Sequence, residues 1–255
     1  MRKSEIYAAY NITYKNGKIL APGGAWINPL LKSGNGKTGK KVFTYSQLAG
    51  SRVWNTSYGT ICGTCAGTCP HCYACSGRYV FDNVKDSNAL HTIITRSDID
   101  FKKRAVIAQI KADKISVVRI HASGDFDTIQ DVNIWRDIVA ACPDVLFWTY
   151  TKRAWPEIDL LNSMDNINIV PSIICGRVNF GTCADLLELK ALEPDAYICP
   201  CGFSDMHCQD CKACALKEHV IFLLHSAPDY NGSEDPLYNQ LKSLVEFQEV
   251  NNNVK

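Results

Sequence analysis

The sequence predicts an α/β fold, a partial or closed (β/α) barrel of about five to six units followed by a cysteine-rich segment that binds metal. Two observations carry this prediction. From residue 42 onward, short β-branched or aromatic runs alternate with helical stretches, a pattern typical of parallel βα units. In addition, ten of the 13 cysteines gather in two groups, a density that core packing does not require. A doubly wound sheet is the alternative architecture.

The expected elements follow in chain order. The expected strands are short and rich in β-branched or aromatic residues, and they cover 42–45, 116–121, 145–150, 167–174, 197–198 and 220–224. The expected helices cover 101–113, 128–141, 154–164, 183–192 and 236–249. The clearest helix is 128–141, because Ile129, Val132 and Trp135 recur on one face. Asp127 or Thr128 is placed to cap it.

These elements divide the chain into three expected parts. Residues 1–41 form an N-terminal extension and a polar, glycine-rich loop. Residues 42–198 form the α/β core, with a cysteine loop at 60–79. Residues 199–255 carry a second cysteine group, the last strand and a C-terminal helix. In a parallel α/β sheet, chemistry is expected at the C-terminal ends of the strands.

Composition limits the cellular setting. The 27 basic and 26 acidic side chains leave a net charge of +1, which argues neither for nor against a nucleic-acid partner. We expect no secretory signal and no membrane partner, because no long apolar segment is present. The odd cysteine count disfavours a disulfide framework. The sequence therefore predicts a reducing, cytoplasmic compartment in which metal holds the thiolates.

The first cysteine loop, residues 60–79, admits two kinds of centre. It contains Cys62, Cys65, Cys69, Cys72 and Cys75. Two C-x2-C pairs within it are typical of a tetrahedral zinc site. Alternatively, the three inner cysteines, spaced C-x3-C-x2-C, would hold a [4Fe–4S] cluster and leave one iron without a protein ligand.

The second cysteine group also predicts a metal centre. Its members are Cys199, Cys201, Cys208, Cys211 and Cys214. Zinc held by four thiolates and a second [4Fe–4S] cluster are both compatible with this spacing.

Polar residues near the strand ends are candidates for binding a cofactor or substrate. If the strands form a barrel, these side chains face a common pocket. They are His121, Asp125, Tyr150, Lys152 and Arg153. A carboxylate beside free backbone groups can orient an ammonium through charge-assisted hydrogen bonds.

The cysteine loop resembles that of radical S-adenosylmethionine enzymes. The resemblance rests on Cys65-Ala-Gly-Thr-Cys69-Pro-His-Cys72-Tyr-Ala, in which His71 replaces the usual aromatic residue. It implies that Cys65, Cys69 and Cys72 bind three irons and that the fourth iron chelates the methionyl group of S-adenosylmethionine. The implied activity is formation of a 5′-deoxyadenosyl radical, which abstracts hydrogen from an unknown substrate. A reducing partner such as flavodoxin or ferredoxin is implied as well.

The order of elements after the loop extends this resemblance. Ser123-Gly124-Asp125 is similar to the Gly-Gly-Glu turn that contacts the cofactor's amino group in that family. Ser172, late in another expected strand, is then a candidate for contact with the ribose.

A second resemblance covers residues 35–215. The segment Arg119-Ile-His-Ala-Ser-Gly-Asp-Phe126 and the later Phe147–Lys152 run, together with the Cys-Tyr-Ala end of the loop, look like the phage-encoded family called gene product eighty-eight. This resemblance implies an origin in a phage and a location in the host cytoplasm. The family's activity is not settled, so it implies no mechanism.

Two functions from different classes follow. The first is an iron–sulfur enzyme of the radical S-adenosylmethionine type. The second is a non-catalytic zinc-binding adaptor for nucleic acid or protein, in which both cysteine groups are structural. A large βα domain with polar strand ends favours the enzyme, because zinc adaptors are usually small.

Overall fold

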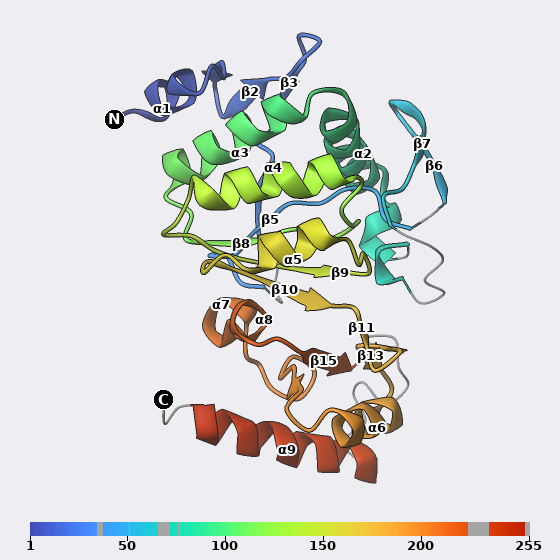
Figure 1. Cartoon of the computed structure of the whole chain (residues 1–255). Helices are drawn as coiled ribbons and strands as arrows, with labels where there is room; N and C mark the ends of the chain where they lie inside the picture. Colours follow the sequence, from blue (N-terminus) through green and yellow to red (C-terminus); the bar gives the residue numbers. More distant parts are fainter. Residues whose placement is uncertain (35–37, 51, 66–71, 76, 224–234, 253–255) are drawn as a thin grey trace.

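A five-stranded sheet and a three-stranded sheet, both open, organise the described part of the chain (Figure 1). The computed structural model describes residues 1–34, 38–50, 52–65, 72–75, 77–223 and 235–252. Helices pack around both sheets, so the mixed α/β class is confirmed. None of the helices in these ranges is long and apolar enough to cross a membrane.

The larger sheet has the order β10-β9-β8-β5-β4. Its strands are β4 (Lys32–Ser33), β5 (Phe43–Thr44), β8 (Val117–Arg119), β9 (Leu146–Thr151) and β10 (Ile167–Pro171). The last four pair in parallel and lie in chain order, whereas β4 is antiparallel to β5. Consecutive parallel strands require crossover connections, and helices supply them here. The C-terminal ends of β5, β8, β9 and β10 therefore meet at one edge.

Four helices cover one face of this sheet (Figure 1). They are α2 (Asp82–Ser97), α3 (Ile99–Asp113), α4 (Ile129–Ala140) and α5 (Pro156–Asn162). Helix α4 confirms the clearest helix expected from the sequence. Its cap is Thr128, whose hydroxyl accepts the Asp131 N–H. Trp135, Ile138 and Val139 are buried in the main core.

The smaller sheet lies on the other side of β10 from these helices (Figure 1). Its order is β13-β15-β14, with β13 (Phe180–Gly181), β14 (Tyr197–Ile198) and β15 (Val220–Leu223) in parallel. Helices α6 (Cys183–Leu192) and α9 (Pro236–Asn252) enclose a second core with it. The strands expected near 197 and 220 therefore exist and pair with each other. Among the described strands, no pairing closes either sheet into a barrel.

Several short elements have no counterpart in the expected pattern. In the N-terminal part they are α1 (Lys3–Ala9), β1 (Tyr14–Lys15), β2 (Lys18–Leu20) and β3 (Trp26–Ile27). A hairpin of β6 (Val53–Thr56) and β7 (Gly59–Cys62) precedes the cysteine loop, and short 3-10 turns follow at Tyr73–Cys75 and Gly77–Val80. Later come β11 (Ile173–Ile174), β12 (Arg177–Val178), α7 (Cys208–Cys211) and α8 (Ala213–Leu216). The expected strand 167–174 is interrupted at Ser172.

A buried ion pair joins α3 to α4. The Lys102 ammonium contacts the Asp131 carboxylate, and both side chains are fully buried. The same ammonium lies 4.8 Å from the Tyr45 ring centroid and 4.9 Å from that of Trp135. Burial alone would raise the pKa of Asp131, but the Lys102 charge lowers it below its ordinary value. Asp131 is therefore ionised, and its charge depends on Lys102.

We expect Asp131→Ala to lower the free energy of unfolding by about 3–5 kcal/mol, because it leaves the Lys102 charge buried without a partner. Urea denaturation measures this change. The matched control is Asp137→Ala on the same helix, since Asp137 contacts Lys103 at 3.3 Å while half exposed. Its expected cost is below about 1 kcal/mol. Equal losses of unfolding free energy in the two variants would contradict the conclusion that Asp131 compensates the buried charge of Lys102.

Candidate functional site

The cysteine loop begins beside the edge where the parallel strands end. Cys65 is half-buried, and its sulfur accepts the Gly50 N–H at 3.1 Å. Burial raises the pKa of the Cys65 thiol to about 12, and the Asp125 and Cys72 charges add to the effect. The Gly50 donor and the Lys152 charge oppose it. Cys65 thus lies in a sheltered environment that contains Cys72, Asp125 and Lys152.

The other described cysteines of the first loop differ in their exposure to solvent. Cys62 is exposed at the end of β7. Cys75 is half-buried, and its sulfur lies 3.0 Å from where a Cβ on Gly50 would stand. Cys75 therefore lies on the same side of the loop as Cys65, whereas Cys62 faces solvent. The expected ligand Cys69, and His71 beside it, lie outside the described residues.

The Ser123–Asp125 turn packs against the start of the cysteine loop. The Asp125 N–H donates to the Thr64 hydroxyl at 3.0 Å, and Thr64 directly precedes Cys65. On the other side of the turn, the Ser123 hydroxyl donates to the Gln47 carbonyl at 2.9 Å. Gly124 has φ +83°, and a side chain there would collide with Thr64 and Gln47. The structure thus brings together two segments about 60 residues apart in the chain.

The Asp125 carboxylate ties the ends of two strands together. Its Oδ1 accepts the Phe126 N–H at 2.8 Å and the Thr151 hydroxyl at 2.7 Å. Its Oδ2 accepts the Lys152 N–H at 3.0 Å. Burial raises the pKa of Asp125 above its ordinary value, and these donors oppose the shift. A carboxylate accepts about four hydrogen bonds, so the described contacts use most of its capacity.

Arg153, one of the polar residues expected near the strand ends, contacts the cysteine loop. Its guanidinium donates to the Thr64 carbonyl at 2.7 Å and to the Phe126 carbonyl at 3.0 Å. It therefore fastens the cysteine loop to the segment after β8. Thr64 and Gln47 were missed because they act through local hydrogen bonds that spacing does not reveal.

His121 lies in the core beneath the turn and away from the strand edge. Its Nε2 is 3.0 Å from the Gln47 side-chain nitrogen, and its ring packs edge-on against Phe126 and Trp135. Burial lowers the pKa of His121 to about 3, so the imidazole is neutral at physiological pH. Ser172 lies beside Thr151, because its N–H donates to the Thr151 carbonyl at 2.8 Å. Ser172 therefore shares the edge with Asp125, and His121 does not.

Tyr150 points toward the second cysteine group. Its hydroxyl donates to the Cys214 sulfur at 2.6 Å, whereas the neighbouring Thr151 contacts Asp125. Successive residues of a strand face opposite sides, so β9 presents Tyr150 to the second cysteine group and Thr151 to Asp125. The expectation of one common pocket for Tyr150 and Asp125 does not match these contacts.

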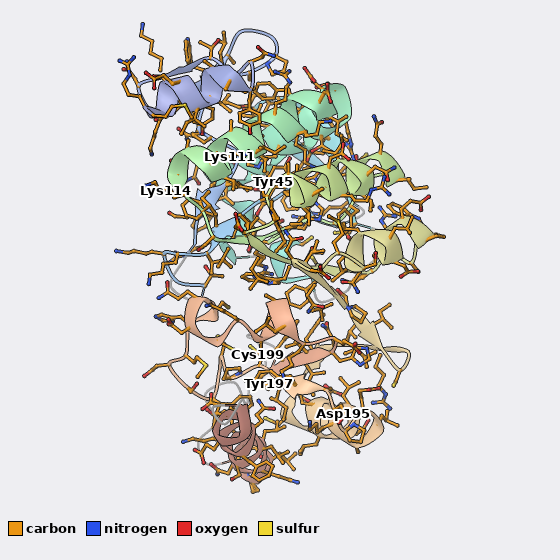
Figure 2. The ribbon with its side chains drawn as sticks, turned by 60° about the vertical axis from the view of Figure 1, so that its left-hand side comes forward. Tyr45, Lys111, Lys114, Asp195, Tyr197 and Cys199 are labelled. Atoms are coloured by element: carbon orange, nitrogen blue, oxygen red, sulfur yellow. The ribbon has the colours of Figure 1, made fainter. Side chains whose placement is uncertain are left out.

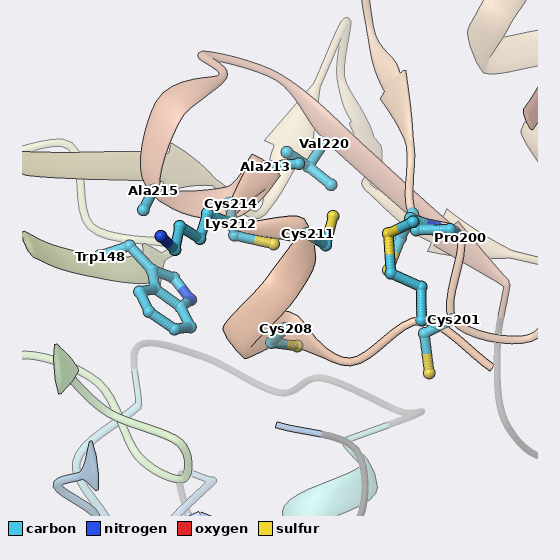
Figure 3. A pocket seen from close by; sticks show the side chains of 12 residues that line it. Trp148, Pro200, Cys201, Cys208, Cys211, Lys212, Ala213, Cys214, Ala215 and Val220 are labelled. Carbon is cyan, nitrogen blue, oxygen red and sulfur yellow. The ribbon is translucent and has the colours of Figure 1, made fainter. Parts of the chain in front are cut away.

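The second cysteine group lines a pocket between the two sheets (Figure 3). The lining residues include Trp148, Cys199, Cys201, Cys208, Cys211, Cys214 and Val220. In Figure 2, Tyr197 and Cys199 lie together in this lower part, and Tyr45 lies among the helices of the upper part. Within the described ranges, no three His, Cys, Asp or Glu side chains converge so as to hold a single ion.

We expect Gly124→Ala to lower the free energy of unfolding by roughly 2–4 kcal/mol, from backbone strain and from overpacking. An added Cβ would lie 2.8 Å from the Thr64 hydroxyl oxygen and 2.9 Å from the Gln47 Cβ. Gly59→Ala is the matched control, because φ is +97° there but no atom lies within 4 Å. Strain alone should cost it about 1–2 kcal/mol. If Gly124→Ala and Gly59→Ala have the same urea midpoint, Gly124 does not lie close against Thr64 and Gln47.

Comparison with known proteins identifies the family. No curated protein and no solved structure matches the chain. A family model described as Gene product 88 matches residues 29–200, which is well over half of the sequence. The match includes the cysteine loop, the Ser123–Asp125 turn and β9, and it confirms the resemblance to that family. The chain belongs to the Gene product 88 family.

Proposed function

We propose that this protein is an iron–sulfur enzyme of the radical S-adenosylmethionine type. The observation that carries the proposal is the hydrogen bond from the Asp125 N–H to the Thr64 hydroxyl at 3.0 Å. It places the cysteine loop, which follows the first parallel strand, against the turn that follows the second. Such an enzyme needs this juxtaposition, because its cluster loop and its cofactor-binding turn serve the same small molecule.

The larger sheet supports the proposal at the level of architecture. Its parallel strands β5, β8, β9 and β10 are neighbours in chain order, as successive units of a barrel are. We take this sheet as the arc of a partial barrel. The candidate residues then lie at the C-terminal ends of its strands, where α/β proteins place their chemistry.

The donor set fits an iron–sulfur cluster. We assign Cys65, Cys69 and Cys72 as its ligands. Cys65 supports this role because its sulfur is sheltered and already accepts a backbone N–H, the kind of hydrogen bond that tunes cluster sulfurs. When bound, the cluster and S-adenosylmethionine would supply an electron and a 5′-deoxyadenosyl radical for hydrogen abstraction from the substrate. Flavodoxin or ferredoxin is the class of reductant we propose.

The chain's own residues would bind and orient the cofactor, and they would exclude water from the site. Gly124 lacks a side chain, so the backbone of the turn can approach Thr64 and hold the start of the cysteine loop against it. Ser123, Gly124 and Asp125 form the proposed surface for the methionyl group, with Ser172 toward the ribose. Because Asp125 already accepts three hydrogen bonds, we assign it mainly to positioning the turn.

The test is anaerobic purification followed by chemical reduction with S-adenosylmethionine. We expect iron and sulfide in the protein and formation of 5′-deoxyadenosine. Cys69→Ala should reduce that formation to background, because a cubane held by two thiolates is not retained in place. Cys62→Ala is the matched control, since Cys62 is exposed at the end of β7, and it should retain formation.

Two results would contradict the proposal. Undiminished 5′-deoxyadenosine from Cys69→Ala would mean that the assigned thiolates are wrong. Zinc bound to the first loop, without iron, in protein never exposed to oxygen would instead favour the structural adaptor.

A further inference from the structure

The second cysteine group surrounds a pocket walled by apolar side chains. Cys208, Cys211 and Cys214 come from α7 and α8, and Cys201 reaches the pocket from the segment after β14 (Figure 3). Trp148, from the larger sheet, forms part of the opposite wall. The apolar walls are completed by Pro200, Ala213, Ala215 and Val220. Thiols from two segments therefore meet in a pocket whose other lining residues are apolar apart from Lys212.

The backbone is bent so that three cysteines reach this pocket. Lys212, between α7 and α8, has φ +53°, a left-handed conformation that is uncommon for a residue other than glycine. In one continuous helix, positions 208, 211 and 214 would each be turned about 60° from the last, and the third would leave the pocket. The bend at Lys212 redirects the chain after Cys211. A strained residue between such cysteines points to a functional constraint.

Four of the five cysteine sulfurs in this group influence one another electrostatically. Cys214 lies within the electrostatic influence of Cys208 and Cys211, and Cys211 within that of Cys201. Cys199 is buried and instead influences the phenols of Tyr150 and Tyr197. Cys199 also lines the pocket, but it is buried beside the tyrosines, whereas Cys201, Cys208, Cys211 and Cys214 are half-buried.

Two phenols point at the sulfurs. Tyr150 donates to Cys214 at 2.6 Å, and the Tyr197 phenol lies within the electrostatic influence of Cys211. Tyr150 and Tyr197 come from different sheets, so the two sheets converge on this group of thiols. Hydrogen bonds to ligand sulfurs tune an iron–sulfur cluster.

The arrangement favours a cluster over a single ion. A cubane spreads its thiolates over separate irons, which suits sulfurs placed around a pocket. Overlapping C-x2-C-x2-C spacing, as in Cys208–Cys214, is also typical of ferredoxin cluster segments.

We propose that Cys201, Cys208, Cys211 and Cys214 hold a [4Fe–4S] cluster of their own, with Tyr150 as a hydrogen-bond donor to one of its ligands. With four thiolates every iron has a protein ligand, so this cluster has no open position for a small molecule. The proposal goes beyond the radical enzyme and does not rest on it, since these residues are separate from the first loop.

The test uses the full chain in which Cys65, Cys69 and Cys72 are all changed to Ala, purified anaerobically. Its iron then reports the second cysteine group alone, whatever becomes of the proposed activity. We expect about four iron and four sulfide per chain, and a spectrum of a reduced cubane after dithionite. Adding Cys211→Ala should lower the iron and sulfide content, whereas adding Cys199→Ala should leave both unchanged.

One zinc per chain without iron would overturn the proposed cluster, and so would a preparation with neither metal. Retention of iron in Cys211→Ala together with its loss in Cys199→Ala would overturn the ligand set.

Tyr150→Phe provides a second readout that does not depend on removing a ligand. The variant should keep its iron, and the midpoint potential of the cluster should shift to a lower value. The reason is that a hydrogen bond to a ligand sulfur stabilises the more negative, reduced form. An unchanged potential would show that the Tyr150 hydroxyl does not contact a ligand of the cluster.

Discussion

The arrangement of the strand edge depends on one buried carboxylate. Burying a charge is costly unless hydrogen bonds compensate it, and Asp125 is compensated by Phe126, Thr151 and Lys152. These donors come from the segments after β8 and at the end of β9, so the carboxylate sets the spacing of both. The backbone of the same residue holds Thr64, and through it the start of the cysteine loop.

The sequence predicted the parallel strands and most of the long helices, because their apolar residues recur with a clear period. It missed α2, whose buried face is polar and includes Asn88, His91, Thr92 and Thr95. These side chains are satisfied by hydrogen bonds, for example from the Leu48 N–H to the Thr92 hydroxyl at 3.0 Å. Periodicity also identifies strands without naming their partners, which is why the separate sheet of β13, β14 and β15 was not foreseen.

The candidate site was predictable where residue type alone indicates chemistry. Cysteine spacing identified both groups, and the Ser123–Asp125 turn followed from its place after a strand. Arg153 was expected near the strand ends, but its hydrogen bond to the Thr64 carbonyl was not foreseen. Thr64 itself was not foreseen, because it accepts a backbone N–H from a distant segment. Alternation along β9 implies that Tyr150 and Thr151 face apart. Which of them faces Asp125 depends on the packing of α8 against β9, which the sequence does not encode locally.

The two faces of β9 contact different partners, and this limits where residues can be inserted or deleted in the chain. Inserting or deleting one residue within the strand would exchange its faces downstream, turning the Tyr150 phenol toward Asp125 and an aliphatic hydroxyl toward the second group. Cys214 and Asp125 would both lose their hydrogen-bond partners on β9 in a single event. Changes of two residues would preserve the alternation. Natural variants of this segment should therefore differ by substitution, or by paired insertions, far more often than by a single added or missing position.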